Sequence, residues 1–338
     1  MISSPLLTET QVKDILSFQG HRVDTVDVAG AILEASEEPP SHPLVPLAHM
    51  DVRDIVHAIA QTWERPHIQS TGAIVKGISQ RAHVLCREAD VAVLSAHFAV
   101  AESGSLLVLD EEGSRVLSVG LVPHVILLMG IEQVLPTWED VEDVIQAFTY
   151  SRVSEHWPNI LVLPTGDEGT QRIDVILVDN GRSSLLKSEF ADVLACIHCG
   201  ACALTCPMFR ETGGQVYGTP YVGPVGALLS SFLSMPKAEE SWSFSCTLCG
   251  ACALACPVDI HLPQLLARKR LTSGAMPSTR WYEALWRWWL DAPGVRIRVL
   301  QTMWNMLGGG RKGMRVLGRW WPFPAPRPLL EVWQDRTR

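Results

Sequence analysis

Two nine-residue stretches, CGACALTCP at Cys199–Pro207 and CGACALACP at Cys249–Pro257, decide the fold of this 338-residue chain. They differ at one position, where Thr205 of the first corresponds to Ala255 of the second. Each has one more cysteine three residues upstream, so each run reads C-x2-C-x2-C-x3-C-P. Cysteines clustered at this pitch indicate a metal site.

The spacing predicts a pair of [4Fe–4S] clusters. A cubane cluster needs four converging thiolates, and three closely spaced cysteines on one loop can supply three of them. In two-cluster ferredoxins the fourth cysteine of each run ligates the other cluster. The sequence therefore predicts two crossed ligand sets, which are Cys196, Cys199, Cys202 and Cys256 for the first cluster and Cys246, Cys249, Cys252 and Cys206 for the second.

Structural zinc is the alternative explanation of these cysteines. Zinc takes four ligands, usually as two C-x2-4-C pairs. It would leave the third cysteine of each run, and the proline that follows the fourth, without a role. Two adjacent clusters transfer single electrons, so we predict electron transfer and leave the donor and the acceptor open.

The amino-acid composition predicts a globular chain that has no membrane-spanning segment. Apolar residues make up 47% of it, and no run of eighteen apolar residues occurs. The start, MISSPLLTETQVKDIL, has no basic segment followed by an apolar one, so we expect no secretory signal and a cytoplasmic location. A reducing cytoplasm argues against disulfides. The ninth cysteine, Cys86, is expected to be a small buried side chain.

Three segments are expected. Residues 1–182 alternate helical and strand patterns and predict an α/β domain. The apolar runs at 91–96, 124–130 and 173–179 predict buried strands, and EEG at 111–113 predicts a hairpin turn. Residues 183–270 predict an α-helical two-cluster ferredoxin domain, because a helical pattern leads directly into Cys196.

Residues 271–338 form a basic, tryptophan-rich tail. From residue 268 onward the chain holds 14 Lys and Arg against 4 Asp and Glu, although the whole chain has a net charge of −8. Eight of the twelve tryptophans also lie here. We expect a helical segment that docks on partner subunits, since Trp and Arg are enriched at interfaces. Peripheral contact with the inner face of the membrane is the second reading, and folding back onto the acidic body is the third. Nucleic acid is not expected, because no recognition motif accompanies the charge.

The segment DNGRSSLLKSEFADVLACIHCGACALTCPMFRETGGQVYGTPYVGPVGALL resembles the LutB-type lactate-utilisation iron–sulfur proteins, which join a LUD domain to a two-cluster ferredoxin-like module. Residues 88–141 are similar to the central part of the LUD domain, and PPSHPLVPLAHM matches its Pro-Ser-His segment at Ser41, His42, Pro46 and His49. The family's Lys-x-Lys-Ser-Met segment is missing, and its acidic segment survives only as Asp24–Gly30. We therefore expect an N-terminally shortened member.

The resemblance implies a LUD fold related to CoA-transferases and sugar-phosphate isomerases. It also implies a subunit of a complex that oxidises L-lactate to pyruvate. The implied partners are a heterodisulfide-reductase-like cysteine-rich protein and a second LUD protein, or, as in related glycolate and D-lactate systems, a flavin-containing dehydrogenase. The reduced acidic segment predicts that this LUD domain serves in docking more than in catalysis.

Two further functions remain open. The LUD domain could be an enzyme with its own small-molecule site near Glu102, which follows a strand pattern where α/β folds place ligands, with His42 and His49 as companions. These side chains could equally be ordinary loop and core residues. The chain could also be a scaffold stabilised by its clusters. His198, between two ligands, could tune a cluster or be a partly solvated side chain.

Overall fold

The computed structural model describes residues 1–2, 4–62, 70–110, 112–151, 159–163, 171–233 and 242–272, and two short strands in the tail. The chain forms two compact units, Met1–Ser273 and Gly274–Arg338. In the second unit the described part is the antiparallel pair β8 (Met314–Val316) and β9 (Arg319–Trp321). The predicted helical docking segment, with its Trp and Arg side chains, lies outside the described residues. Within the first unit we call residues 1–182 the α/β region and 183–272 the cysteine region.

The α/β region is built on a parallel sheet with the order β1-β4-β7. Its strands are β1 (Val91–Ser95), β4 (His124–Gly130) and β7 (Arg172–Val178). Side chains alternate across β4: Val125, Leu127 and Met129 enter the main core, and Leu128 faces a second, smaller one. Because both faces of β1 and β4 are covered, their sequences are continuous apolar runs instead of alternating ones.

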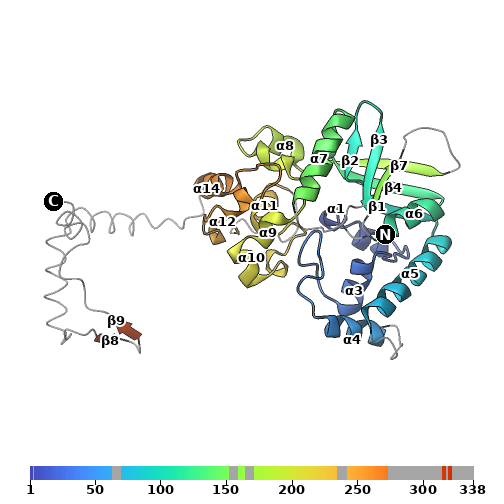
Figure 1. Cartoon of the computed structure of the whole chain (residues 1–338), viewed down its shortest axis with the longest axis horizontal. Helices are drawn as coiled ribbons and strands as arrows, with labels where there is room; N and C mark the ends of the chain where they lie inside the picture. Colours follow the sequence, from blue (N-terminus) through green and yellow to red (C-terminus); the bar gives the residue numbers. More distant parts are fainter. Residues whose placement is uncertain are drawn as a thin grey trace. The chain divides into compact units, whose positions relative to one another are not determined.

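Helices cover the two faces of this sheet (Figure 1). The helices α5 (Thr71–Glu88) and α6 (Ser114–Leu121) pack together, and α6 also contacts β1. The short α1 (Pro5–Glu9) lies on the other face, where Leu6 and Leu7 contact Val93 and Leu128. Ser4 caps α1, because its hydroxyl accepts the N–H of Leu7 at 3.3 Å. The N-terminus is thereby fixed on the sheet.

Two of the remaining N-terminal helices, α3 (Val28–Ser36) and α4 (Val52–Thr62), pack together and on α5, whereas α2 (Val12–Phe18) packs on α1. A small core between α3, α4 and α5 contains Ile32, Ile59, Ile74 and Ile78. The loop between α3 and α4 leaves this group and reaches the cysteine region.

A second, mixed sheet has the order β5-β2-β3-β6. Its strands are β5 (Val134–Leu135), β2 (Phe98–Val100), β3 (Ser105–Asp110) and β6 (Asn159–Leu163). In β3, Leu106 and Val108 enter the main core, whereas Leu107 and Leu109 enter another core beneath α7 (Trp138–Tyr150). This last core also contains Cys199 and Ala201, so the second sheet and the first cysteine run share one apolar interior.

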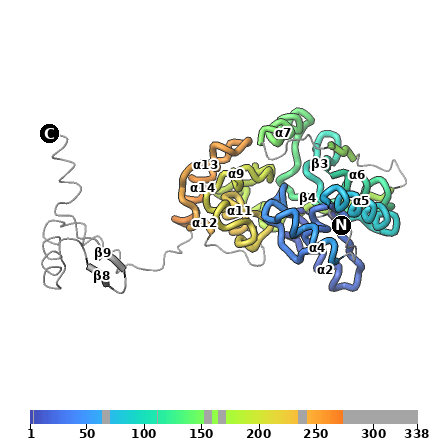
Figure 2. The backbone as a smooth tube through the Cα atoms, turned by 60° about the horizontal axis from the view of Figure 1, so that its bottom comes forward, coloured from blue at the N-terminus to red at the C-terminus, as the bar shows by residue number. Residues whose placement is uncertain are grey.

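The cysteine region is a compact set of short helices (Figure 2). Its longer members are α10 (Pro207–Thr212), α11 (Gly223–Leu229) and α14 (Leu262–Thr272), and α11 lies beside α14. Around these are the single turns α8 (Arg182–Leu186), α9 (Ala201–Leu204), α12 (Trp242–Ser245) and α13 (Ala251–Leu254). Their shared core includes Leu228, Leu262 and Leu266, together with Cys202 and Cys252. The expected helical character of this region agrees with these elements.

Two expectations about the α/β region were wrong. The hairpin expected around 111–113 needs a second strand after residue 113, and the chain forms the helix α6 from Ser114 instead. The Asp110 carboxylate accepts the N–H groups of Gly113 and Val116 at 3.0 and 2.9 Å, and this bonding starts a helix where the sequence predicts a second strand. The strand β7 is present but is not buried, since Ile176 and Leu177 are 48% and 56% exposed at the edge of the sheet.

Candidate iron–sulfur site

The two cysteine runs fold into the same loop, which we call the first loop (Cys196–Cys206) and the second loop (Cys246–Cys256). His198 and Leu248 occupy equivalent positions and both have φ of 56°. Gly200 and Gly250 follow with φ of 73° and 84° and begin the single helical turns α9 and α13. Glycine is favoured at such positions because it has no Cβ to clash in the left-handed region. The sequence repeat is therefore also a repeat of backbone conformation.

Backbone N–H groups point at the cysteine sulfurs in both loops. The N–H of His198 donates to Cys196 Sγ at 3.4 Å, and the N–H of Leu248 donates to Cys246 Sγ at 3.3 Å. The N–H of Ile260 donates to Cys256 Sγ at 3.3 Å. Hydrogen bonds of this kind favour the thiolate, which is the form of cysteine that binds metal.

Four cysteines from the two loops line one cavity. They are Cys196, Cys199, Cys202 and Cys256, and apolar side chains such as Val225 and Leu262 complete the wall. The other four influence one another electrostatically, because Cys246, Cys206 and Cys249 all contribute to the pKa of Cys252. The two groups are adjacent, since Cys252 in turn acts on Cys202. The fold thus brings three cysteines of the first loop and one of the second to a single cavity.

The donor set suits an iron–sulfur cluster. Burial raises the pKa of Cys196 to about 12 and that of Cys252 to about 11. Such thiols ionise when a bound cation compensates the negative charge. Among the described residues no three His, Cys, Asp or Glu side chains converge tightly enough for a single ion. A cubane distributes its thiolates over four irons, so its ligands stand farther apart than those of one ion.

The surroundings of the two loops differ. In the first loop Cys199 and Cys202 are buried, with 6% and 8% of their surface exposed. In the second loop Cys249 is exposed, and its pKa is lowered by hydrogen bonds from the Ala251 N–H and the Thr247 side chain. The neighbouring Leu254 is 93% exposed. The first loop therefore faces the α/β region, and the second faces the outside.

His42 joins the α/β region to the first loop. Its Nδ1 accepts the N–H groups of Leu44 and Val45 at 3.2 and 3.1 Å, so the proton lies on Nε2, which donates to the Gly200 carbonyl at 3.2 Å. Burial lowers the pKa of His42, which keeps the ring neutral. A Cβ on Gly200 would lie 2.2 Å from the His42 ring. His42 thus supports the cysteine loop by direct contact.

The other candidates from the sequence do not join His42. Glu102 is exposed, and its carboxylate accepts the N–H of Trp138 at 2.9 Å, which places it at the start of α7. His49 is an exposed loop residue. His198 lies in the first loop, with its ring 5.2 Å from that of Tyr221. The structure does not bring Glu102, His42 and His49 into one site.

Two protein families match the chain. The LUD domain family matches residues 16–183, and the 4Fe-4S dicluster domain family matches residues 192–260. The second match contains both cysteine loops. The chain therefore carries a LUD domain followed by a 4Fe-4S dicluster domain. The second match supports iron–sulfur clusters as the groups that the cysteines bind.

Curated relatives are about one third identical to this chain. "Uncharacterized electron transport protein YkgF" of Escherichia coli K12 is 34% identical over 79% of this chain and 58% of its own length. "Lactate utilization protein B 1" of Bacillus mycoides is 33% identical over 68% of this chain and 49% of its own length. "Lactate utilization protein B" of Bacillus subtilis is 31% identical over 68% and 50%. The chain thus spans about half the length of these relatives.

Sequence reasoning missed a polar group between the two regions. His97, Arg115, Glu132 and Arg182 lie within or just after elements of the α/β region, and all line one cavity beside the first loop. No short motif connects them, because they are spread over 86 positions and meet only in the fold. Glu132 and Arg182 follow the carboxyl ends of β4 and β7, which is the one signal that could have indicated them.

Proposed function

We propose that this chain is the iron–sulfur electron-transfer subunit of a complex that oxidises lactate or a related 2-hydroxy acid. The carrying observation is the grouping of Cys196, Cys199, Cys202 and Cys256 around one cavity, with Cys206 among the neighbours of Cys252. This arrangement supports two [4Fe–4S] clusters with crossed ligands. The names of the relatives support electron transport and lactate utilisation.

A bound [4Fe–4S] cluster accepts and releases one electron at a time. The protein would hold each cluster by three cysteines of one loop and one of the other. The apolar wall around the first set, which includes Val258 and Ile260, would exclude water, and the backbone N–H groups would stabilise the thiolates. Because Cys199 of the first loop is buried and Cys249 of the second is exposed, the two clusters would link the interior of the chain to its surface.

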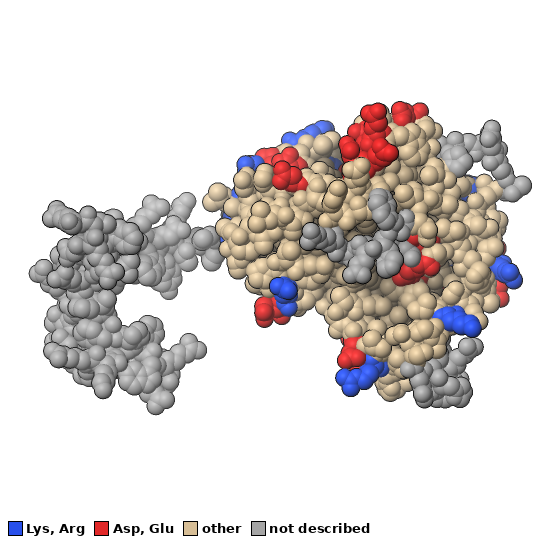
Figure 3. Space-filling model, viewed as in Figure 1, with Lys and Arg blue, Asp and Glu red and all other residues tan. Residues whose placement is uncertain are grey.

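Partner subunits would complete the electron-transfer pathway. Oxidation of a 2-hydroxy acid removes two electrons, and the cysteines imply only clusters that carry one electron each. We propose a cysteine-rich heterodisulfide-reductase-like protein, a second LUD protein or a flavin-containing dehydrogenase. Acidic side chains gather on the outer face of α7 (Figure 3), where Glu139, Glu142 and Asp143 are exposed. The inner face of α7 contacts the core that contains Cys199. A partner with a basic surface could therefore be attracted close to the first loop.

Localisation is proposed to be cytoplasmic, with the tail as a partner-docking or membrane-surface segment. Among the described residues there is no helix with the length and hydrophobicity needed to cross a bilayer.

The ligand assignment is tested by exchanging the crossing cysteines. Chain purified without oxygen should contain about eight irons and eight sulfides. Cys206→Ser should reproduce the electron paramagnetic resonance (EPR) changes of Cys249→Ser, because both would ligate the second cluster. Cys256→Ser should reproduce those of Cys199→Ser. Cys86→Ala, in the core of the α/β region, should leave the spectrum and the iron content unchanged.

Two outcomes contradict this proposal. If Cys206→Ser resembles Cys199→Ser, each loop holds its own cluster. If the wild-type clusters form but cannot be reduced by any partner that copurifies, the chain is a cluster-stabilised scaffold. An independent enzyme is the remaining candidate, and it requires turnover by the isolated chain that Glu102→Gln abolishes.

A further inference from the structure

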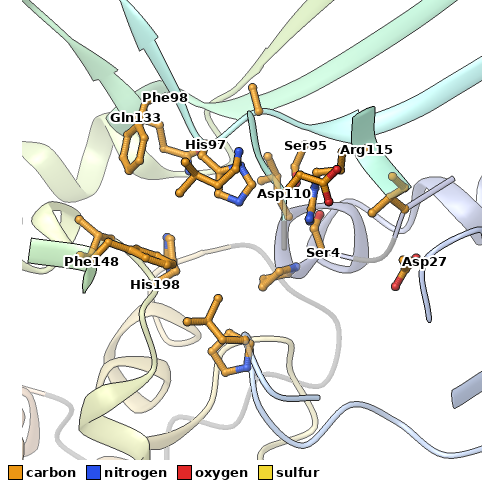
Figure 4. Close-up of a pocket in the computed structure, with 18 of the residues that line it drawn as sticks. Ser4, Asp27, Ser95, His97, Phe98, Asp110, Arg115, Gln133, Phe148 and His198 are labelled. Carbon is orange, nitrogen blue, oxygen red and sulfur yellow. The ribbon is translucent and has the colours of Figure 1, made fainter. Parts of the chain in front are cut away.

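A cavity of about 160 Å³ lies between the α/β region and the first loop (Figure 4). We call it the junction cavity. Most of its wall comes from the α/β region, and the first loop contributes Ile197 and His198. These two residues lie between Cys196 and Cys199, so a molecule in the cavity would touch the loop proposed to hold the first cluster.

Arg115 supplies a positive charge and an unpartnered N–H donor to this cavity. It lies on α6, and its positive charge partly offsets the rise that burial causes in the pKa of the neighbouring Glu112. Its Nε is buried without a partner. The other lining arginine, Arg182, is fully engaged, because it pairs with Glu9 and Glu132. A buried cationic donor without a partner is costly, and an anionic ligand would remove that cost.

His97 adds a neutral donor next to Arg115. Its Nδ1 accepts the N–H of Leu109 at 3.1 Å, so the neutral ring carries its proton on Nε2. Burial, with the positive charge of Arg115 as the next cause, lowers the pKa of His97 to about 3, which keeps the ring neutral at physiological pH. Figure 4 shows both side chains extending into the cavity from the same side.

The acidic groups of the wall restrict the charge of a ligand. The described lining residues include four carboxylates, Asp27, Asp110, Glu112 and Glu132. Asp27 accepts the N–H of Gly30, and Glu112 accepts the N–H of Val28. Asp110 accepts the N–H groups of Gly113 and Val116. Their negative charge would repel a dianion such as phosphate. A monoanion bound beside Arg115 suits the cavity better.

Glu132 supplies an acceptor that lacks a donor. Its Oε1 accepts Arg182 Nε at 2.8 Å, but its Oε2 is buried without a hydrogen-bond partner. Glu132 already shares the charge of Arg182 with Glu9, and the acceptor that remains on Oε2 can take a hydrogen bond from a neutral hydroxyl. The volume limits the ligand as well, because a cavity of about 150 Å³ accommodates benzene, with six non-hydrogen atoms. A three-carbon 2-hydroxy acid also has six.

We propose that the junction cavity binds a small 2-hydroxymonocarboxylate, with Arg115 and His97 donating to its carboxylate and its hydroxyl donating to Glu132. This inference concerns binding and includes no oxidation step. The choice of lactate as the probe rests on the proposed function, which names 2-hydroxy acids as the substrates of the complex. The ligand would lie beside the first loop, the buried end of the proposed electron path.

The test is calorimetric titration of the purified, cluster-containing chain with lactate. We expect saturable binding, weaker binding of pyruvate, which lacks the hydroxyl, and no binding of phosphate. Lactamide is the matched ligand control, because it replaces the carboxylate of lactate by a neutral amide and should not bind. Bound lactate should also shift the EPR signal of the first cluster.

Variants assign the contacts. Arg115→Gln should weaken lactate binding by about 10- to 100-fold, the loss expected for a hydrogen bond to a charged group. His97→Asn should also weaken it, while its amide oxygen can still accept the Leu109 N–H. Arg53→Gln is the control, because the Arg53 side chain is 91% exposed and, among the residues that the structure describes, bonds to Asp51 alone. Neither cavity variant should alter iron content or reduction by dithionite.

Several results would overturn the inference. Absence of saturable lactate binding in a chain with intact, reducible clusters would disprove it and leave the proposed function standing. Equal binding of lactamide would exclude Arg115 as a carboxylate site, and equal binding of pyruvate would exclude the contact to Glu132. If clusters are absent altogether, the proposed function fails, whatever the titration shows.

Discussion

The neutral state of His97 couples the stability of the α/β region to pH. In the folded chain the pKa of this side chain is about 3, against an ordinary value of 6.5. Between these values the unfolded chain binds a proton that the folded chain does not. Stability therefore falls as the pH decreases below about 6.5, because unfolding is then accompanied by proton uptake.

His97→Asn should remove this dependence. At pH 5.5 the wild-type chain should have lost about 1.4 kcal/mol of unfolding free energy through His97, because this pH is one unit below the unfolded pKa and one unit corresponds to about 1.4 kcal/mol. The variant keeps an acceptor for the Leu109 N–H but has no titrating ring. Thermal unfolding at pH 7.5 and pH 5.5 measures the difference. Identical pH dependence in both proteins would show that His97 takes up its proton in the folded chain as readily as in the unfolded chain.

Thr205 and Ala255 illustrate what a single residue contributes to the repeat. The hydroxyl of Thr205 donates to the carbonyl of Ala201 at 3.2 Å, within the turn that both loops share. Ala255 lacks this bond, yet α13 has the same form as α9. The difference between the two phrases is therefore a local hydrogen bond and leaves the loop conformation unchanged.

At the level of elements, the two loops have equal backbones and unequal neighbours. Gly200 and Gly250 both have positive φ, so a side chain at either position would strain the turn. A Cβ at Gly200 would also collide with the His42 ring, whereas a Cβ at Gly250 would meet nothing within 4 Å. Substituting these two glycines separately therefore distinguishes the free-energy cost of backbone strain from that of a clash with His42.

Gly250→Ala should destabilise the chain by about 1–2 kcal/mol, the cost of a left-handed conformation for a residue with a side chain. Gly200→Ala should cost clearly more and should reduce the iron bound at the first loop. Denaturation and iron analysis measure the two effects. His42→Ala in the Gly200→Ala background should recover part of the loss. Equal effects of the two glycine variants would mean that the first loop does not depend on His42.

The sequence was most informative where local pattern and final structure coincide. The cysteine spacing predicted both loops, and the apolar runs predicted β1 and β4, because these strands are covered on both faces. The hairpin at 111–113 failed because the Asp110 side chain, not the turn residues, determines that a helix begins after β3. The junction cavity could not be predicted, since Arg115 and His97 carry no motif and only tertiary packing leaves them facing one space.

At the scale of the whole molecule, a buried ionic group connects the α/β region to the cysteine region. Arg182 donates to Glu9 at 2.7 and 2.8 Å and to Glu132 at 2.8 Å. The Tyr221 hydroxyl, from the cysteine region, donates to Glu9 at 2.6 Å. Burial opposes ionisation of Glu9, but the hydrogen bonds from Arg182, Tyr221 and Asn180 outweigh it and lower the pKa.

Removing one partner of this ionic group should strongly reduce the stability of the folded chain. Glu9→Gln should lower the free energy of unfolding by about 3 kcal/mol, because it leaves part of the Arg182 charge buried without compensation. The double variant Glu9→Leu with Arg182→Met should be less damaging than Glu9→Gln alone. Chemical denaturation provides the comparison, and Arg53→Gln serves as the control. A loss below about 0.5 kcal/mol for Glu9→Gln would show that water reaches the group.

The position of Glu9 has a consequence for biosynthesis. Tyr221 lies 212 residues after it along the chain. At roughly 5–20 residues per second, the ribosome takes on the order of 10–40 seconds to supply the tyrosine after the glutamate has been made. During that interval the glutamate lacks the tyrosine and, for most of it, the arginine that will neutralise it. Helix α1 is therefore expected to settle on the sheet late, after the ferredoxin segment has left the ribosome, although it is the first helix to be synthesised.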